Sequence, residues 1–62
     1  MKRQEFLAIL RANLAGIEEK ELEDIMYDYE EHFTIGLEKN KIEEEISEAL
    51  GNPVHIANAY KA

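Results

Sequence analysis

The 62-residue chain lacks the residues on which many small folds and many kinds of site depend. It contains no cysteine, which excludes disulfide bridges and thiolate metal sites. Its longest apolar run, residues 6–10, is far shorter than the roughly twenty residues of a membrane-spanning helix. A chain this short, without disulfides, must depend on regular helix packing or on a partner for its stability.

Basic residues are also scarce. Seven Lys and Arg stand against fourteen Asp and Glu, for a net charge of −7. The net charge of residues 1–17 is +2, whereas that of residues 18–48 is −10. Because nucleic-acid binding needs clustered Lys and Arg to neutralise phosphates, direct nucleic-acid binding is excluded, and contact of the main face with an anionic membrane is disfavoured. A basic protein partner fits this charge.

Apolar residues recur three and four apart and predict one all-α domain over residues 1–62. Four helices are expected, at about residues 3–15, 18–39, 43–50 and 53–61, with short connections and the long second helix packed against the other three. The apolar positions of these helices are Phe6, Leu7, Leu10, Leu14, Leu22, Ile25, Met26, Tyr29, Phe33, Leu37, Ile46, Ala49, Leu50, Val54, Ala57 and Tyr60.

The ends of the helices coincide with residues that stop or start helices. Gly16, Asn40 and Gly51 are the expected stops, and Asn52-Pro53 opens the fourth helix because asparagine caps and proline tolerates the first helical position. Gly36 falls inside the second helix, where it costs about 1 kcal/mol relative to alanine. We therefore expect another helix to approach closely at Gly36.

No pattern indicates catalysis. The only serine, Ser47, has no histidine near it in sequence, and the chain has no glycine-rich phosphate loop. Residues 43–61 have the outline of a helix-turn-helix but lack the basic residues of a recognition helix. The sequence therefore predicts no enzyme, no catalytic residue and no cofactor.

The second helix carries the residues expected to bind a partner. Asp24, Asp28 and Glu31 form an acidic face with Tyr27, which is either an exposed anchor or a half-buried flank residue. His32 and His55 are expected to edge a groove. Asp28 and His32 are four residues apart and could touch one metal ion. Di-iron bundles need Glu-x-x-His on more than one helix, whereas the residue three before His32 is Tyr29 and His55 has no such partner, so no metal site is predicted and a metal switch is only an alternative.

Two segments have a recognisable combination of residues: Asp-Tyr-Glu-Glu-His-Phe at 28–33 and Leu-Gly-Asn-Pro-x-x-Ile-Ala at 50–57. Together with Glu5-Phe6-Leu7, Gly36, the acidic stretch 42–46 and Tyr60, they resemble the HAAS family, the helix-turn-helix-associated alpha-helical signalling domains. The resemblance spans essentially the whole chain. The departures lie at helix ends: Glu18 replaces a frequent proline, Ile42 replaces a serine-like cap, and Asn40 and Asn52 replace glycine and aspartate.

The resemblance implies a non-enzymatic signalling module, the cytoplasmic N-terminal part of a bacterial membrane protein. It implies a place at the inner face of the membrane, through a transmembrane segment absent from this chain, and a PadR-like transcription regulator as partner. The acidic face meeting the basic DNA-reading surface of that regulator would compete with DNA. The alternative is self-association, a dimerisation that assembles a membrane protein. The fourth helix reaches Ala62 without a stop signal, so the chain is expected to be a fragment of a longer protein.

Overall fold

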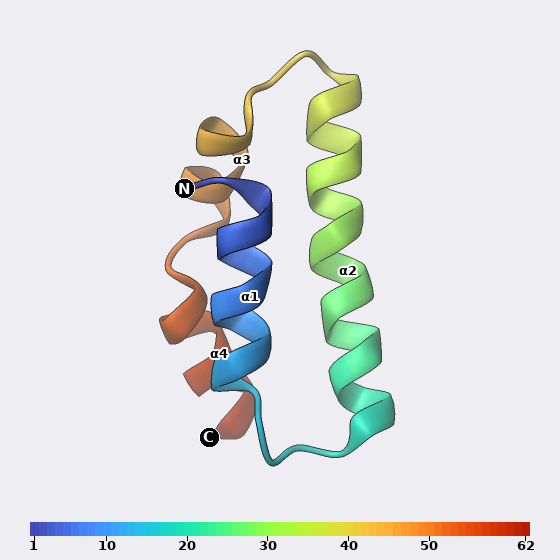
Figure 1. The fold of residues 1–62 in the computed structure, drawn as a ribbon, viewed down its shortest axis with the longest axis vertical. Helices are drawn as coiled ribbons and strands as arrows, with labels where there is room; N and C mark the ends of the chain where they lie inside the picture. The colour runs from blue at the N-terminus through green and yellow to red at the C-terminus, as the bar shows by residue number, and fades with distance from the viewer.

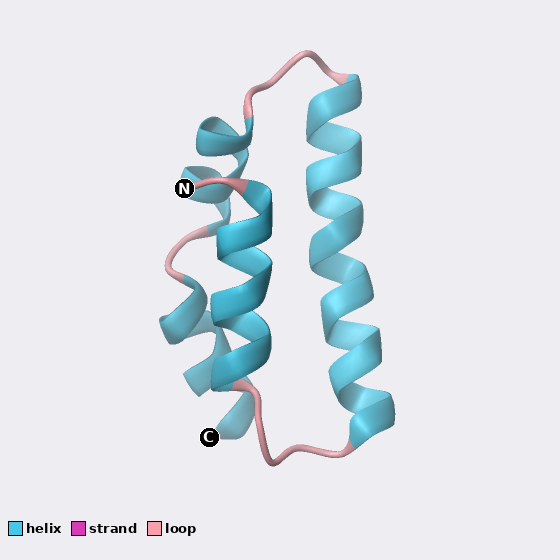
Figure 2. Ribbon diagram, viewed as in Figure 1, coloured by secondary structure: helices cyan, strands magenta, loops and turns pink.

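Four helices make up the fold of the computed structural model, which describes residues 1–62. Helix α1 spans Arg3–Asn13, α2 spans Glu19–Glu38, α3 spans Glu43–Leu50 and α4 spans Pro53–Lys61 (Figure 1). The chain has no strand, and three loops join the helices (Figure 2). The predicted all-α fold with four helices is confirmed, and the bounds of α3 and α4 agree with the prediction.

The predicted end of α1 at residue 15 is wrong by two residues, since the helix ends at Asn13. The backbone N–H of Ala15 donates to the carbonyl of Ala12, three residues back, at 3.4 Å. This tighter bonding ends the α-helical turn before the chain reaches Gly16, whose φ of 100° only glycine adopts readily.

Helix α2 is one residue shorter at each end than the predicted 18–39. Glu18 has ψ 138° and is the residue before the helix, and Lys39 has already left helical geometry with ψ 15°. Asn40 takes the left-handed conformation with φ 65°, and the N–H of Lys41 donates to the carbonyl of Gly36 at 3.1 Å. These two features form a Schellman-type stop, so the predicted stop at Asn40 is confirmed.

The core lies mainly between α1 and α2. Phe6, Leu10, Leu14 and Phe33 are fully buried, and the ring of Phe33 meets that of Phe6 edge-on, with centroids 5.4 Å apart. Such edge-on aromatic pairs are favoured by the ring quadrupoles. The remaining buried hydrophobic residues are Ile25, Met26, Ile46 and Ala57.

Helix α1 packs against all three other helices, most extensively against α4 (Figure 1). The sequence predicts that α2 is the helix that packs against the other three. This prediction is wrong, because α2 packs extensively only against α1 and α3. Helix α1 fully buries Phe6 and Leu10, and Leu14, which directly follows its last residue, is fully buried as well. Helix α2 buries one face and leaves the rest to solvent.

Four residues expected in the core are exposed instead: Leu37, Ala49, Val54 and Tyr60. Leu37 is 39% exposed because the buried face of α2 is centred on Ile25, Phe33 and Gly36, and Leu37 lies at the edge of that face. The short helices α3 and α4 each bury one narrow face, around Ile46 and Ala57 respectively.

Helix α3 approaches α2 closely at Gly36, as predicted. A Cβ atom added to Gly36 would lie 2.6 Å from both Cγ1 and Cδ1 of Ile46. Carbon atoms in proteins do not approach so closely without a shift, so the absence of a side chain at Gly36 is what admits Ile46. The glycine therefore offsets its low helix propensity by allowing this contact.

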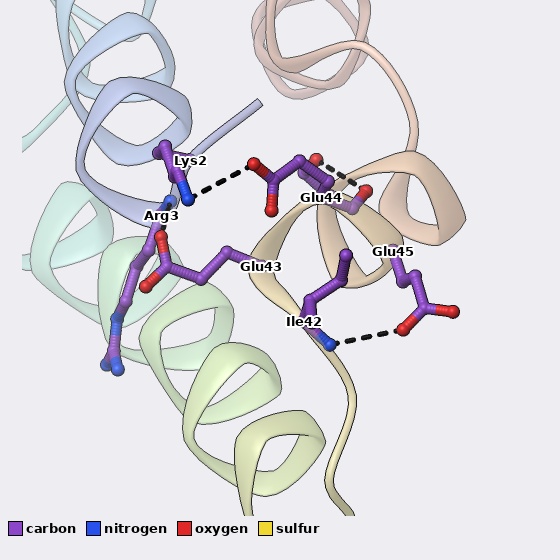
Figure 3. Close-up of polar contacts among 7 residues, drawn as sticks. Lys2, Arg3, Ile42, Glu43, Glu44 and Glu45 are labelled. Atoms are coloured by element: carbon purple, nitrogen blue, oxygen red, sulfur yellow. Dashed lines mark hydrogen bonds and ion pairs between the residues drawn. The ribbon is translucent and has the colours of Figure 1, made fainter.

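The first turn of α3 caps the start of α1 (Figure 3). The backbone N–H of Arg3 donates to Oε1 of Glu43 at 2.7 Å, and Nζ of Lys2 lies 3.2 Å from Oε2 of Glu44. The N–H groups of a first helical turn have no partner within their own helix, so Glu43 satisfies one of them from 40 residues away. The backbone N–H of Glu44 and the Lys2 ammonium hold the pKa of the Glu44 carboxyl below its usual value.

The start of α3 itself is only half capped. Ile42 has no side-chain acceptor, but its backbone N–H donates to Oε1 of Glu45 at 3.1 Å (Figure 3). In a complete capping box the first residue would also accept a bond from the third helical N–H. The start of α4 is capped fully as predicted, since Oδ1 of Asn52 accepts the N–H of Val54 at 2.8 Å.

Candidate interaction surface

The predicted acidic face lies on one side of α2, away from the core. Asp24, Asp28 and Glu31 are all exposed, and their spacing of four and three residues places them on adjacent turns. None of the three forms an ion pair within the chain, whose two ion pairs are Lys2–Glu44 and Arg11–Glu23. The face therefore presents unneutralised carboxylates to solvent.

Tyr27 lies beside this face and is 64% exposed. The alternative that Tyr27 is a half-buried flank residue is therefore wrong. An exposed tyrosine among carboxylates offers a large, rigid contact area with few rotamers to order, a property that favours tyrosine in interfaces.

His32 lies on the border between the acidic face and a groove that runs beside α2. The groove has two adjoining parts, and both are lined by His32 and Ile35. The first part, about 190 Å³, lies between α2 and α3 and is lined further by Gly36, Lys39, Lys41, Ile46, Ala49 and Leu50. The second part, about 320 Å³, extends towards α4 and is lined further by Asp28, Tyr29, Glu31 and Tyr60.

His55 is exposed on α4 and does not line either part of this groove. The structure thus brings together on α2 five of the six predicted partner-binding residues and leaves His55 apart from them. The sequence interpretation missed Ile35, Lys39 and Tyr60. One signal was available for Ile35, because it is the aliphatic residue of α2 that falls on the acidic side, away from the core positions.

Tyr29 forms the floor where the groove meets α4. Its ring lies 5.7 Å from that of His32 and 6.1 Å from that of Phe6, measured between centroids. Burial raises the pKa of the Tyr29 hydroxyl, and the neighbouring Tyr60 and Asp28 side chains raise it further. At neutral pH Tyr29 is uncharged, and it lies between the buried Phe6 and the exposed His32.

The acidic side chains do not converge on a common point. Nowhere do three or more His, Asp or Glu side chains approach closely enough to hold a metal ion together. Asp28 and His32 share one helix face as a pair, without a third ligand. None of the four helices combines the length and the apolar composition that crossing a membrane would require.

The surface thus combines carboxylates on adjacent turns of α2 with a groove of mixed polar and apolar lining. The sequence profile of the HAAS family matches residues 5–59. The chain belongs to the HAAS family. HAAS domains are non-catalytic signalling and interaction domains associated with PadR-like regulators. The matched region includes parts of all four helices and every residue of the acidic face and the groove except Tyr60. No curated protein and no solved structure matches the chain.

Proposed function

We propose that this HAAS domain binds a PadR-like transcription regulator through the acidic face of α2, formed by Asp24, Tyr27, Asp28 and Glu31. The face would meet the basic DNA-reading surface of the regulator, and the domain would therefore compete with DNA for it. The observation that carries the proposal is that these exposed carboxylates have no cationic partner in their own chain.

The physical argument is one of charge complementarity. A DNA-reading surface is rich in Lys and Arg because it must neutralise phosphates. A helix with carboxylates on successive turns presents the same sign of charge as the DNA backbone, and complementary potentials speed association and set orientation. Tyr27 would supply the apolar contact at the centre of such an interface.

The test is binding of the purified domain to a PadR-like regulator from the same organism, measured by calorimetry. The double charge reversal Asp24→Lys with Glu31→Lys should weaken binding on the order of tenfold or more. The control, Glu19→Lys with Glu48→Lys, changes the net charge equally but alters exposed positions outside the face and the groove. Unchanged binding in the first variant would show that the face is not the binding surface.

Competition with DNA is a separate consequence and needs its own measurement. In a mobility-shift assay with the regulator's operator DNA, the domain should release the DNA at concentrations where it binds the regulator. If the domain binds the regulator while the operator stays bound, the contact lies elsewhere on the regulator and the competition mechanism is wrong.

We also propose that the domain lies at the inner face of the bacterial membrane in its natural protein, held by a transmembrane segment that follows residue 62. The family resemblance supports this placement. An immunoblot of membrane and soluble extracts tests it. A band well above 7.2 kDa in the membrane fraction is expected, whereas a soluble band at that mass would contradict the proposal.

A further inference from the structure

The groove beside α2 has opposite charges at its two ends. Lys39 and Lys41 line the part next to α3, and Asp28 and Glu31 line the part next to α4. None of these four residues forms an ion pair within the chain. The chain has only seven Lys and Arg, so two unpaired lysines beside one groove are a concentration of positive charge on an otherwise acidic surface.

Apolar atoms occupy the middle of the groove. Ile35 is 43% exposed and is shared by both parts, with Ala49 and Leu50 on one side and Tyr60, 46% exposed, on the other. A groove with an apolar centre, a basic end and an acidic end is complementary to itself when it is turned end over end. Two-fold symmetric interfaces have this property, because each contact then occurs twice.

The spacing along α2 fixes a register for such a pairing. Lys39 directly follows the last residue of α2, and its N–H still donates to the carbonyl of Ile35 at 3.1 Å. Asp28 and Lys39 are eleven residues apart, which is three turns, so they lie on the same side of the helix about 16 Å apart along its axis. If two copies of α2 run antiparallel with Lys39 opposite Asp28 of the second copy, the same register places Ile35 opposite His32. Two charge pairs then flank a centre made of both copies of Ile35.

We propose that the occupant of this groove is a second copy of the chain, in an antiparallel two-fold dimer built on α2. This inference goes beyond regulator binding and does not depend on it. Because Asp28 and Glu31 belong both to the groove and to the acidic face, dimerisation covers two carboxylates of the face. A chain in the dimer is therefore a poorer ligand for a basic partner than a free chain.

Sedimentation equilibrium of the 62-residue chain tests the proposal. The contact is small and two chains of charge −7 repel each other, so the range is about 10 μM to 1 mM, where weak interfaces become populated. The average mass should rise with concentration from 7.2 kDa towards twice that value. A salt concentration of about 0.15 M reduces the long-range repulsion to a range of about 8 Å.

Two variants, each replacing an aliphatic residue of α2 with asparagine, test the centre of the interface. Ile35→Asn should lower the association constant on the order of tenfold or more, because it places a polar side chain at a contact made twice. Leu37→Asn is the matched control, since Leu37 is 39% exposed on the same helix but does not line the groove. Circular dichroism of both variants establishes that the fold is intact.

A charge exchange tests the register. Asp28→Lys and Lys39→Glu should each weaken dimerisation of their own chain, because each places like charges opposite one another twice. An equimolar mixture of the two variants should dimerise better than either alone, since both charge pairs are then of opposite sign. Glu38→Lys and Lys20→Glu, on the same helix but outside the groove, are the matched charge controls.

Three results would overturn the proposal: a monomer over the whole concentration range, dimerisation unaffected by Ile35→Asn, or a mixture no stronger than its separate variants. A monomer would show that a second copy does not cover the groove. These outcomes are distinguishable from failure of regulator binding, because sedimentation is measured on the domain alone, with no regulator present.

Discussion

Replacing Gly36 with alanine should destabilise the domain, although alanine is the better helix former. Gly36 lies within α2, two residues from its end, and an added Cβ would lie 2.6 Å from Cγ1 and Cδ1 of Ile46. Ile46 belongs to the core and is only 5% exposed, so moving its side chain away would disturb its core packing. The clash includes Cγ1, which a rotation of the terminal methyl group cannot relieve.

Two opposing terms set the size of the effect. The gain in helix propensity is about 1 kcal/mol, whereas overpacking a core contact costs about 1–3 kcal/mol. The free energy of unfolding should therefore fall by about 0–2 kcal/mol. A chain of this length has a total stability of about 3–9 kcal/mol, and each 1 kcal/mol lost lowers the melting temperature by about 4–8 °C.

Urea unfolding followed by circular dichroism measures the change. Ala8→Gly, at an exposed position in α1, calibrates the propensity term and should cost about 1 kcal/mol. Ile46→Val removes Cδ1, so in that background the cost of Gly36→Ala should shrink by at least about 0.5 kcal/mol. If Gly36→Ala instead raised the stability by about 1 kcal/mol in the wild-type background, the close approach of α3 would be refuted.

Three further predictions concern caps and protonation. Asn52→Ala should cost about 1 kcal/mol, measured by urea unfolding, because the N–H of Val54 loses its acceptor. Glu43→Ala should cost about 1–2 kcal/mol by removing the charged acceptor of the Arg3 N–H, and Glu43→Gln, which keeps an acceptor, should cost less. The pKa of Tyr29 is raised in the folded state, so the folded state favours the neutral hydroxyl. The contribution of this group to the free energy of unfolding is fully present below the unfolded pKa of about 10 and is lost as the pH rises through the folded pKa. Between pH 8 and 11 the melting temperature of the wild type should fall relative to that of Tyr29→Phe, which has no group to ionise at this position; a constant difference would contradict this reasoning.

The sequence predicts those parts of the fold that depend on single residues with special backbone properties. Asn52 and Gly51 set the break between α3 and α4, and both helices have their predicted bounds. Asn40 stops α2 through its left-handed conformation, and Gly36 marks the close helix contact. The end of α1 is not set by such a residue, because tightening of the last turn ends the helix before Gly16, and there the prediction is two residues too long.

The parts of the candidate surface that come from a single helix are also predictable. Asp24, Asp28 and Glu31 share a face of α2 through their spacing alone, whatever the tertiary packing. The groove is different, because its walls come from three helices. That Ala49 of α3 and Tyr60 of α4 lie beside Ile35 depends on the docking of these helices, about which helical periodicity carries no information.

Gly36 connects the stability of the fold to the shape of the groove. It admits Ile46 of α3, and the docking of α3 places Ala49 and Leu50 across from Ile35. Gly36→Ala should therefore displace α3 and weaken self-association together with stability. Ile35→Asn should weaken self-association while leaving stability unchanged within about 0.5 kcal/mol, as is usual for exposed positions. A Gly36→Ala variant that lost stability yet dimerised as the wild type does would show that the interface consists of α2 alone and does not require the position of α3.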